Sequence, residues 1–126
     1  MGGTGLNAVQ SEEVYRVICT AARLRQPIAA TYEGAQRRLC PYVVGHNDAG
    51  ECRVFCYQYG GDSRSEPYLG GKAGVWRCLS LTRISRVELL NDEWRSEAHS
   101  PQHCVKHVEV DADAGAYAAG DPQNGQ

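Results

Sequence analysis

Several features that define large classes of protein are missing from this chain of 126 residues. No apolar run reaches the roughly 20 residues that a membrane-spanning helix needs. The first ten residues, MGGTGLNAVQ, have no basic stretch followed by an apolar one, so they do not resemble a secretory signal peptide. These absences predict a cytoplasmic protein that does not enter membranes.

Catalytic signatures are missing as well. The sequence has no Ser-centred nucleophile motif and no paired-carboxylate signature. The glycine pairs at 60–61 and 70–71 do not lead into a helix that carries a lysine, as a phosphate-binding loop would. Covalent catalysis also needs a nucleophile beside a positioned base, and no such arrangement is indicated. We therefore expect a protein that is not an enzyme and needs no cofactor.

Charge of one sign is not in large excess. The chain has 13 basic and 15 acidic residues and a net charge of -2, which argues against general electrostatic attraction to nucleic acid. The distribution is uneven, however, because residues 14–90 hold eleven basic and six acidic residues. A basic central region favours anionic ligands. A coding bias toward arginine, alanine and glycine explains the same excess equally well.

Cysteine is well represented, with six residues, and a cytoplasmic location predicts that all six are reduced. The segment GECRVFCYQYGG places Cys52 and Cys56 four residues apart among aromatic residues. In a strand their side chains share one face but lie about 13 Å apart, too far for a common metal ion. We interpret both as small buried apolar residues. A weaker candidate metal site consists of His103, Cys104 and His107.

The apolar pattern predicts one helix followed by short strands. Val14, Val17, Ile18, Ala21 and Leu24 form a helical stripe in a helix from Ser11, its cap, to Arg25, and Pro27 prevents continuation. Glu12 and Glu13 would lie in the first turn, where the helix dipole favours acids. Five strands are expected at 28–32, 37–44 (with Pro41 at an edge or bulge), 52–59, 75–81 and 84–90, with a loop over 60–74.

These elements predict a mainly β fold with one N-terminal helix, in which a small antiparallel barrel of the Sm-like or SH3 type is capped by the helix. Trp94 would plug an end of the barrel. The expected organisation is a flexible arm over 1–10, the domain over 11–95, a polar linker over 96–110 and a disordered acidic tail over 111–126. Residues 104–110 are either an additional strand or part of the tail.

The order of four segments, ICTAARLRQPIAATYEG, RRLCPYVV, CRVFCYQYGG and WRCLSLTRISRVELL, resembles a WYL domain over about residues 14–94. The matching positions are Tyr32, Gly34, Arg37 or Arg38, Pro41, Arg77, Leu79, Leu81, Arg83 and Ile84. The name-giving Trp-Tyr-Leu triplet is replaced by Val54-Phe55-Cys56, and Ser80 stands where the family often has another arginine. A single helix before Pro27 supplies no helix-turn-helix, so the resemblance implies a stand-alone effector module.

The resemblance implies an Sm-like barrel that binds a nucleotide or single-stranded nucleic acid in bacterial transcriptional regulation. Arginines contact phosphate and aromatic rings stack on bases. Arg77, Leu79, Leu81 and Arg83 would share one face of a strand. The predicted ligand-binding residues are Tyr32, Arg38, Arg77 and Arg83 for the anion and Tyr57 or Tyr59 for stacking. The alternatives are a protein-interaction or self-associating module, with the aromatic strand exposed at an edge, and a metal-binding protein that uses His103, Cys104 and His107.

Overall fold

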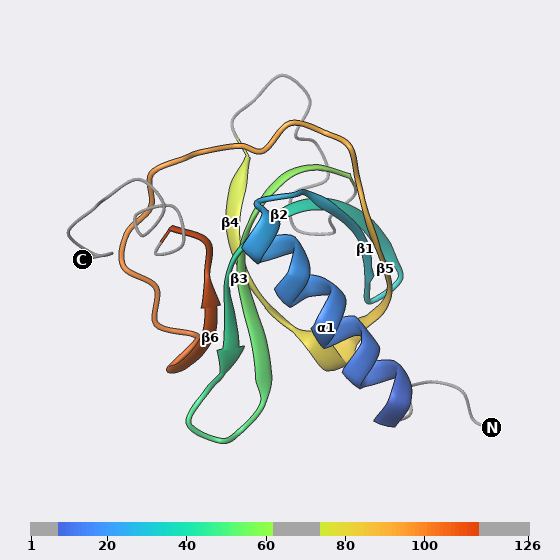
Figure 1. Cartoon of the computed structure of the whole chain (residues 1–126), viewed down its shortest axis with the longest axis vertical. Helices are drawn as coiled ribbons and strands as arrows, with labels where there is room; N and C mark the ends of the chain where they lie inside the picture. The colour runs from blue at the N-terminus through green and yellow to red at the C-terminus, as the bar shows by residue number, and fades with distance from the viewer. Residues whose placement is uncertain (1–7, 62–73, 114–126) are drawn as a thin grey trace.

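A computed structural model describes residues 8–61 and 74–113 of the chain (Figure 1). One α-helix precedes the strands of a six-stranded antiparallel sheet. The elements are α1 (Ala8–Leu24), β1 (Ile28–Tyr32), β2 (Ala35–His46), β3 (Cys52–Gly61), β4 (Val75–Ser80), the 3-10 helix η1 (Leu81–Arg83), β5 (Ile84–Leu89) and β6 (His107–Asp111). The predicted mainly β fold with one N-terminal helix is confirmed.

Helix α1 starts at Ala8, three residues before the predicted start. Ser11 therefore lies inside the helix and does not cap it, and the first turn holds no acidic residue. The end is as expected, because Arg25 leaves the helical conformation with a φ of 54° and the Gln26 amide donates to the Ala21 carbonyl oxygen at 2.9 Å. Part of the predicted apolar stripe is buried on the sheet, with Val14, Ile18 and Ala21 in the core, but Leu24 at its end is 61% exposed.

The sheet is organised around the long strand β2. Its strand order is β4-β3-β2-β1-β5, and β6 pairs with β2 outside this path. Along one edge of β2, β1 pairs with residues 35–39 and β6 with residues 43–46, while β3 occupies the other edge. The register shifts between Pro41 and Val43, so the predicted bulge at the proline is confirmed.

The sheet curls strongly but is not closed into a barrel (Figure 1). Strands β4 and β5 stand at the two ends of the strand order and are joined through η1, with no ladder between them in the described residues. The 3-10 turn also ends the alternation of β4 at Ser80. Arg77 and Leu79 therefore share a face, and Leu81 is buried in the same inner core as Leu79, but the predicted extension of that face to Arg83 is wrong because Arg83 is exposed.

Two hydrophobic clusters lie on opposite faces of the sheet. On the inner face, α1 packs against side chains that include Leu39, Val54 and Ile84. On the outer face a second cluster contains Tyr42, Tyr57 and Trp76 together with partly buried neighbours. Alternation along β3 sends Val54 and Cys56 to the inner cluster and Phe55, Tyr57 and Tyr59 to the outer one. Cys52 and Cys56 therefore behave as predicted for a strand, not for a metal site.

Two cysteines correct the prediction that all six thiols are reduced. Cys78 of β4 and Cys104, which precedes β6, form a disulfide with their Cα atoms 6.3 Å apart. Cys19, Cys40, Cys52 and Cys56 are free. The sulfur of Cys104 is therefore not available as a thiolate, and the proposed metal site of His103, Cys104 and His107 loses a ligand. Within residues 8–61 and 74–113 no group of three His, Cys, Asp or Glu residues is placed to hold a metal ion.

The predicted segment boundaries change at both ends. Helix α1 begins inside the predicted arm of residues 1–10, and β6 continues to Asp111, the first residue of the predicted tail. Residues 112 and 113 of that tail are also described, whereas 114–126 and most of the predicted loop over 60–74 lie outside the described residues. Trp94 packs on Tyr42 of the outer cluster, with ring centres 5.0 Å apart, so it does not plug a barrel end. No helix of the described part is long and apolar enough to cross a bilayer.

Candidate functional site

The six predicted ligand-binding residues fall into two groups on opposite faces of the sheet. In β2, Arg37 is buried with Leu39 toward the inner face, and Arg38 between them is exposed. On the inner face, Tyr32 contacts Arg37, and Arg77 donates to Gln58 beside it. On the outer face, Arg38 and Tyr59 both contact Asp92. The structure therefore does not unite the predicted site.

The inner group, which we call the Arg37 cluster, consists of Tyr32, Arg37, Gln58 and Arg77. Gln58 is fully buried, and its Oε1 accepts hydrogen bonds from Arg37 Nη1 at 3.3 Å and from Arg77 Nε at 2.7 Å. The guanidinium carbon of Arg37 lies 5.0 Å from the ring centre of Tyr32, a cation–π distance. Three adjacent strands thus bring two guanidinium groups to one neutral oxygen.

Within the described residues, the charge of Arg37 is poorly compensated. Arg37 is 7% exposed, and its Nε is buried without a hydrogen-bond partner in the described residues. Burial lowers the pKa of Arg37, and the charge of Arg77 lowers it further. No carboxylate within residues 8–61 and 74–113 forms an ion pair with Arg37, although Glu33 is near enough to act on it electrostatically. A buried cation of this kind is costly until an anion pairs with it.

Glu33 and Arg83 form the rim of the Arg37 cluster. The two-residue turn between β1 and β2 has positive φ at Glu33 (51°) and Gly34 (83°), as a type I′ hairpin requires. This turn holds the Glu33 carboxylate against the Arg83 guanidinium in an exposed ion pair, and the pair raises the pKa of Arg83. The predicted anion contact of Arg83 is therefore occupied by a carboxylate of the chain itself.

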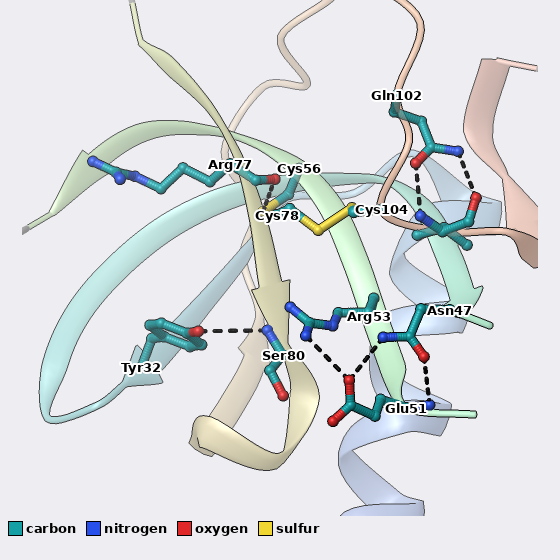
Figure 2. Close-up of a disulfide and its surroundings, with 11 residues drawn as sticks. Tyr32, Asn47, Glu51, Arg53, Cys56, Arg77, Cys78, Ser80, Gln102 and Cys104 are labelled. Atoms are coloured by element: carbon teal, nitrogen blue, oxygen red, sulfur yellow. Dashed lines mark hydrogen bonds and ion pairs between the residues drawn. A yellow bond between two sulfur atoms is a disulfide. The ribbon is translucent and has the colours of Figure 1, made fainter. Parts of the chain in front are cut away.

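Figure 2 shows how β4 separates Arg77 from the disulfide. The side chains of Arg77 and Cys78 leave the strand in opposite directions, as alternation requires. Tyr32 is also labelled there, and its hydroxyl oxygen accepts a hydrogen bond from the Ser80 amide at 3.4 Å. The far end of β4 is thereby tied to β1, which positions Tyr32 beside Arg37.

The outer group lines an open groove of about 530 Å³ with Arg38, Tyr59, Gly60, Gly61, Asp92, Glu93 and Arg95. Its charges already compensate one another. Asp92 accepts a hydrogen bond from the Tyr59 hydroxyl at 2.6 Å and lies 3.5 Å from Arg38 Nη1. Arg95 covers the ring of Tyr59 at 4.6 Å from its centre. The groove therefore presents neither an uncompensated basic surface nor an uncovered ring.

The contacts of Tyr57 are those of a residue that stabilises the fold. Tyr57 is only 5% exposed, and its ring packs on the ring of Trp76 with the ring centres 5.0 Å apart. Its hydroxyl accepts a hydrogen bond from the Gly74 amide at 2.7 Å. A base cannot stack on this ring in the structure described. The strand that carries it, β3, is paired with β2 and β4, so it also offers no free edge for the predicted protein contact.

Sequence reasoning missed Arg37 as a site residue and passed over Gln58. Arg37 and Arg38 are adjacent, and the family pattern fits either one. Strand alternation could have separated them, because Leu39 is a clear core residue and Arg37 shares its parity. Gln58 was placed on the face of Cys56, but nothing in a single strand indicates that two arginines from its neighbours converge on its side-chain oxygen.

Comparison with known proteins adds no assignment, since no protein-family model and no curated protein matches this chain. The resemblance to WYL domains rests on the order of its sequence segments alone.

Proposed function

We propose that this protein is a non-enzymatic ligand-sensing module that binds a phosphate group of a nucleotide or of single-stranded nucleic acid at the Arg37 cluster. The observation that carries the proposal is the buried guanidinium of Arg37, which within the described residues forms no ion pair and has no hydrogen-bond partner at Nε. A phosphate oxygen at this position would accept from Arg37 and offset the cost of burying its charge.

The second guanidinium supports phosphate as the ligand. Arg77 donates through Nε to the oxygen that Arg37 also uses, so the two positive groups face one small region. A phosphate has three acceptor oxygens and more than one negative charge, which suits two arginines better than a carboxylate does. Tyr32 beside Arg37 supplies an aromatic surface, and its ring is only partly buried.

The wider assignment follows from the resemblance to WYL domains. In that interpretation the curled sheet corresponds to an Sm-like barrel, and the module regulates transcription in the bacterial cytoplasm in response to its ligand. The Arg37 cluster lies at residues within the matching segments, with Tyr32, Arg37 and Arg77 all among the matching positions. We assign no role in catalysis to these residues.

The test is equilibrium binding of a labelled, 5′-phosphorylated oligothymidine of about ten nucleotides, a length that small barrels accommodate. The expected result is binding at low salt that weakens between about 50 mM and 200 mM salt. Arg37→Met and Arg77→Ala should each weaken it at least about tenfold, the loss expected for a charged hydrogen bond. Arg86→Ala serves as the matched control, because Arg86 is an exposed arginine of β5.

Two results would overturn the proposal. One is the absence of binding by the oligonucleotide and by free nucleoside phosphates at low salt. The other is an equal loss of affinity in Arg86→Ala and Arg37→Met, because that would indicate diffuse attraction to positive charge. Circular dichroism of each variant establishes that a loss of affinity is not a loss of fold.

A further inference from the structure

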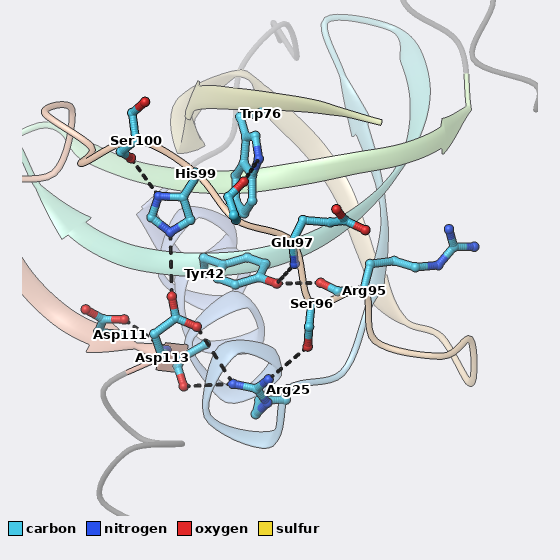
Figure 3. A network of polar contacts seen from close by, with 12 residues as sticks. Arg25, Tyr42, Trp76, Arg95, Ser96, Glu97, His99, Ser100, Asp111 and Asp113 are labelled. Atoms are coloured by element: carbon cyan, nitrogen blue, oxygen red, sulfur yellow. Dashed lines mark hydrogen bonds and ion pairs between the residues drawn. The ribbon is translucent and has the colours of Figure 1, made fainter. Parts of the chain in front are cut away.

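The outer face of the sheet is covered by one irregular segment, residues 90–106, which we call the strap. It connects β5 to β6 and contains no strand or helix. Under it lie the aromatic side chains of Tyr42 and Trp76 (Figure 3). Phe55 lies there as well, against His99 of the strap. The disulfide between Cys78 and Cys104 joins β4 to the strap near its end. The strap therefore covers the outer face and is covalently attached to β4.

Apart from the disulfide, the strap is held mainly through isolated contacts. The Tyr42 hydroxyl donates to the Arg95 carbonyl oxygen and accepts from the Glu97 amide at 3.3 Å. Trp76 donates from Nε1 to the Ala98 carbonyl oxygen at 3.1 Å. These are single bonds to side chains, not the repeated bonds of a ladder. A segment held in this way opens at a lower free energy than the core of a sheet.

His99 inserts from the strap among the rings of the outer face. Its ring centre lies 4.6 Å from that of Trp76 and 5.0 Å from that of Phe55. Its Nε2 lies 3.5 Å from a carboxylate oxygen of Asp113, and that carboxylate also approaches Arg25 Nη1 at 3.9 Å (Figure 3). The strap therefore fills the space between rings that would otherwise form an open aromatic surface.

We propose that the Cys78–Cys104 disulfide is a thiol-sensitive latch, whose reduction releases the strap and uncovers the aromatic face of β2, β3 and β4. The bond is accessible, because Cys78 is an exposed residue and Cys104 is half-buried. The inner core, with α1 and Leu39, Val54 and Ile84, lies on the other side of the sheet and does not depend on the strap. Disulfides of cytoplasmic proteins, where they occur, are typically transient or redox-sensing.

The chemistry is thiol–disulfide exchange with an external dithiol. Its thiolate attacks the sulfur of Cys78, the more exposed residue of the pair, and the Cys104 thiolate leaves and takes up a proton. The second thiol of the reagent then attacks the mixed disulfide and releases Cys78 as a thiol. The protein gains two electrons and two protons, and the dithiol becomes a cyclic disulfide.

The other cysteines do not compete in this exchange. Cys19, Cys40 and Cys56 are buried and Cys52 is half-buried. Burial raises the pKa of all four thiols, that of Cys56 to about 12, so little nucleophilic thiolate forms at neutral pH. Reshuffling to another pairing is therefore disfavoured, and the latch has one closed state.

The test uses the intact chain and its own tryptophans. Both tryptophans of the sequence, Trp76 and Trp94, lie at the strap interface, so their fluorescence reports on it alone. Quenching by acrylamide should increase at least about twofold when the oxidised protein is treated with dithiothreitol, because local opening exposes both rings. Hydrogen exchange at the Glu97 amide should accelerate in parallel, and reoxidation should reverse both changes.

Matched variants complete the experiment. Cys78→Ser combined with Cys104→Ser should show the high quenching without reductant, whereas Cys52→Ser should respond as the parent does. Far-UV circular dichroism should be nearly unchanged on reduction. The proposal is overturned if reduction leaves quenching unaltered, if it unfolds the whole protein, or if the unreduced protein has six reactive thiols after denaturation.

Discussion

Arg37 and Arg77 stand on β2 and β4 and donate to the same atom, Oε1 of Gln58 on the strand between them. Two like charges are thereby directed toward one neutral acceptor, and Arg37 is buried while it does so. Proteins keep such an arrangement at a cost to stability, since each buried charge loses hydration. The simplest physical reason for keeping such a site is a ligand whose negative charge offsets the cost of burying the positive charge.

The first prediction is that Arg37→Met separates stability from binding. Methionine fills a similar volume without a charge, so we expect the free energy of unfolding to change by less than about 1 kcal/mol, or to increase, because replacing buried ionic groups is often neutral or stabilising. Phosphate binding should fall at least about tenfold. Urea unfolding and equilibrium binding check the two parts. A loss of stability above about 3 kcal/mol would mean that Arg37 is structural.

The second prediction concerns Glu33. Its carboxylate neutralises Arg83 and adds negative charge beside the Arg37 cluster. Glu33→Gln keeps the size of the side chain and should tighten phosphate binding about threefold at low salt, the scale of an exposed charge interaction. Glu88→Gln is the control, because Glu88 pairs with Ala29, away from Tyr32 at the opposite end of β1. Equal effects of the two variants would contradict a local role for Glu33.

The third prediction compares two tyrosine hydroxyls. Tyr42→Phe removes the group that bonds both Arg95 and Glu97 of the strap, and should cost about 1–2 kcal/mol of unfolding free energy. Tyr15→Phe removes a buried hydroxyl that has no well-formed hydrogen bond to a described residue and lies near the Cys19 thiol, a weak partner. Its effect should stay within about 0.5 kcal/mol. Thermal or urea unfolding measures both, and a larger loss in Tyr15→Phe would reverse the assignment.

The fourth prediction is a loss of stability in alkali. Burial raises the pKa values of Tyr15, Tyr42 and Tyr59, and the carboxylate of Asp92 raises that of Tyr59 further. Unfolded tyrosine ionises near about pH 10. Above that pH the folded state retains protons that the unfolded state releases, so stability that is present below about pH 10 is lost as the pH rises through the folded pKa values.

Absorbance of the phenolate near 295 nm follows these ionisations directly. In the folded protein part of the phenol signal should titrate only above the normal range, and it should return to that range in urea. Tyr59→Phe should reduce the delayed fraction. A single normal titration of all phenols in the folded protein, with constant stability up to that pH, would contradict the prediction.

Local patterns in the sequence were enough to predict most elements of the fold. The helical stripe and Pro27 predicted α1 to within three residues at its start, and alternation predicted β1 with its observed bounds. The strand from Cys52 was identified because its aromatic residues share one parity. Closure of the sheet could not be predicted in this way, because whether β4 meets β5 depends on curl accumulated over all strands. The disulfide was missed because a cytoplasmic location was predicted, in which thiols are expected to stay reduced. The distances between cysteines, which decide the pairing, are set by the fold.

The candidate site was predictable only in part. Tyr32 and Arg77 were named and do lie near each other through Arg37 and Gln58. Arg38 was chosen in place of Arg37, although the parity of Leu39 distinguishes them. Arg83 was assigned to a continuous strand, and the 3-10 turn at Leu81–Arg83 redirects it to Glu33. Such turns depend on tertiary contacts that a single sequence does not display.

The most direct measurement is the side-chain ¹⁵N resonance of Arg37 Nε during titration with a nucleoside monophosphate. Loss of the signal in Arg37→Met assigns it. We predict that this resonance shifts in proportion to saturation, because the Nε–H that lacks a partner in the described residues gains a phosphate oxygen as acceptor. The resonance of Arg86 should stay in place. If phosphate binds and the Arg37 Nε signal does not move, the Arg37 cluster is not the ligand site.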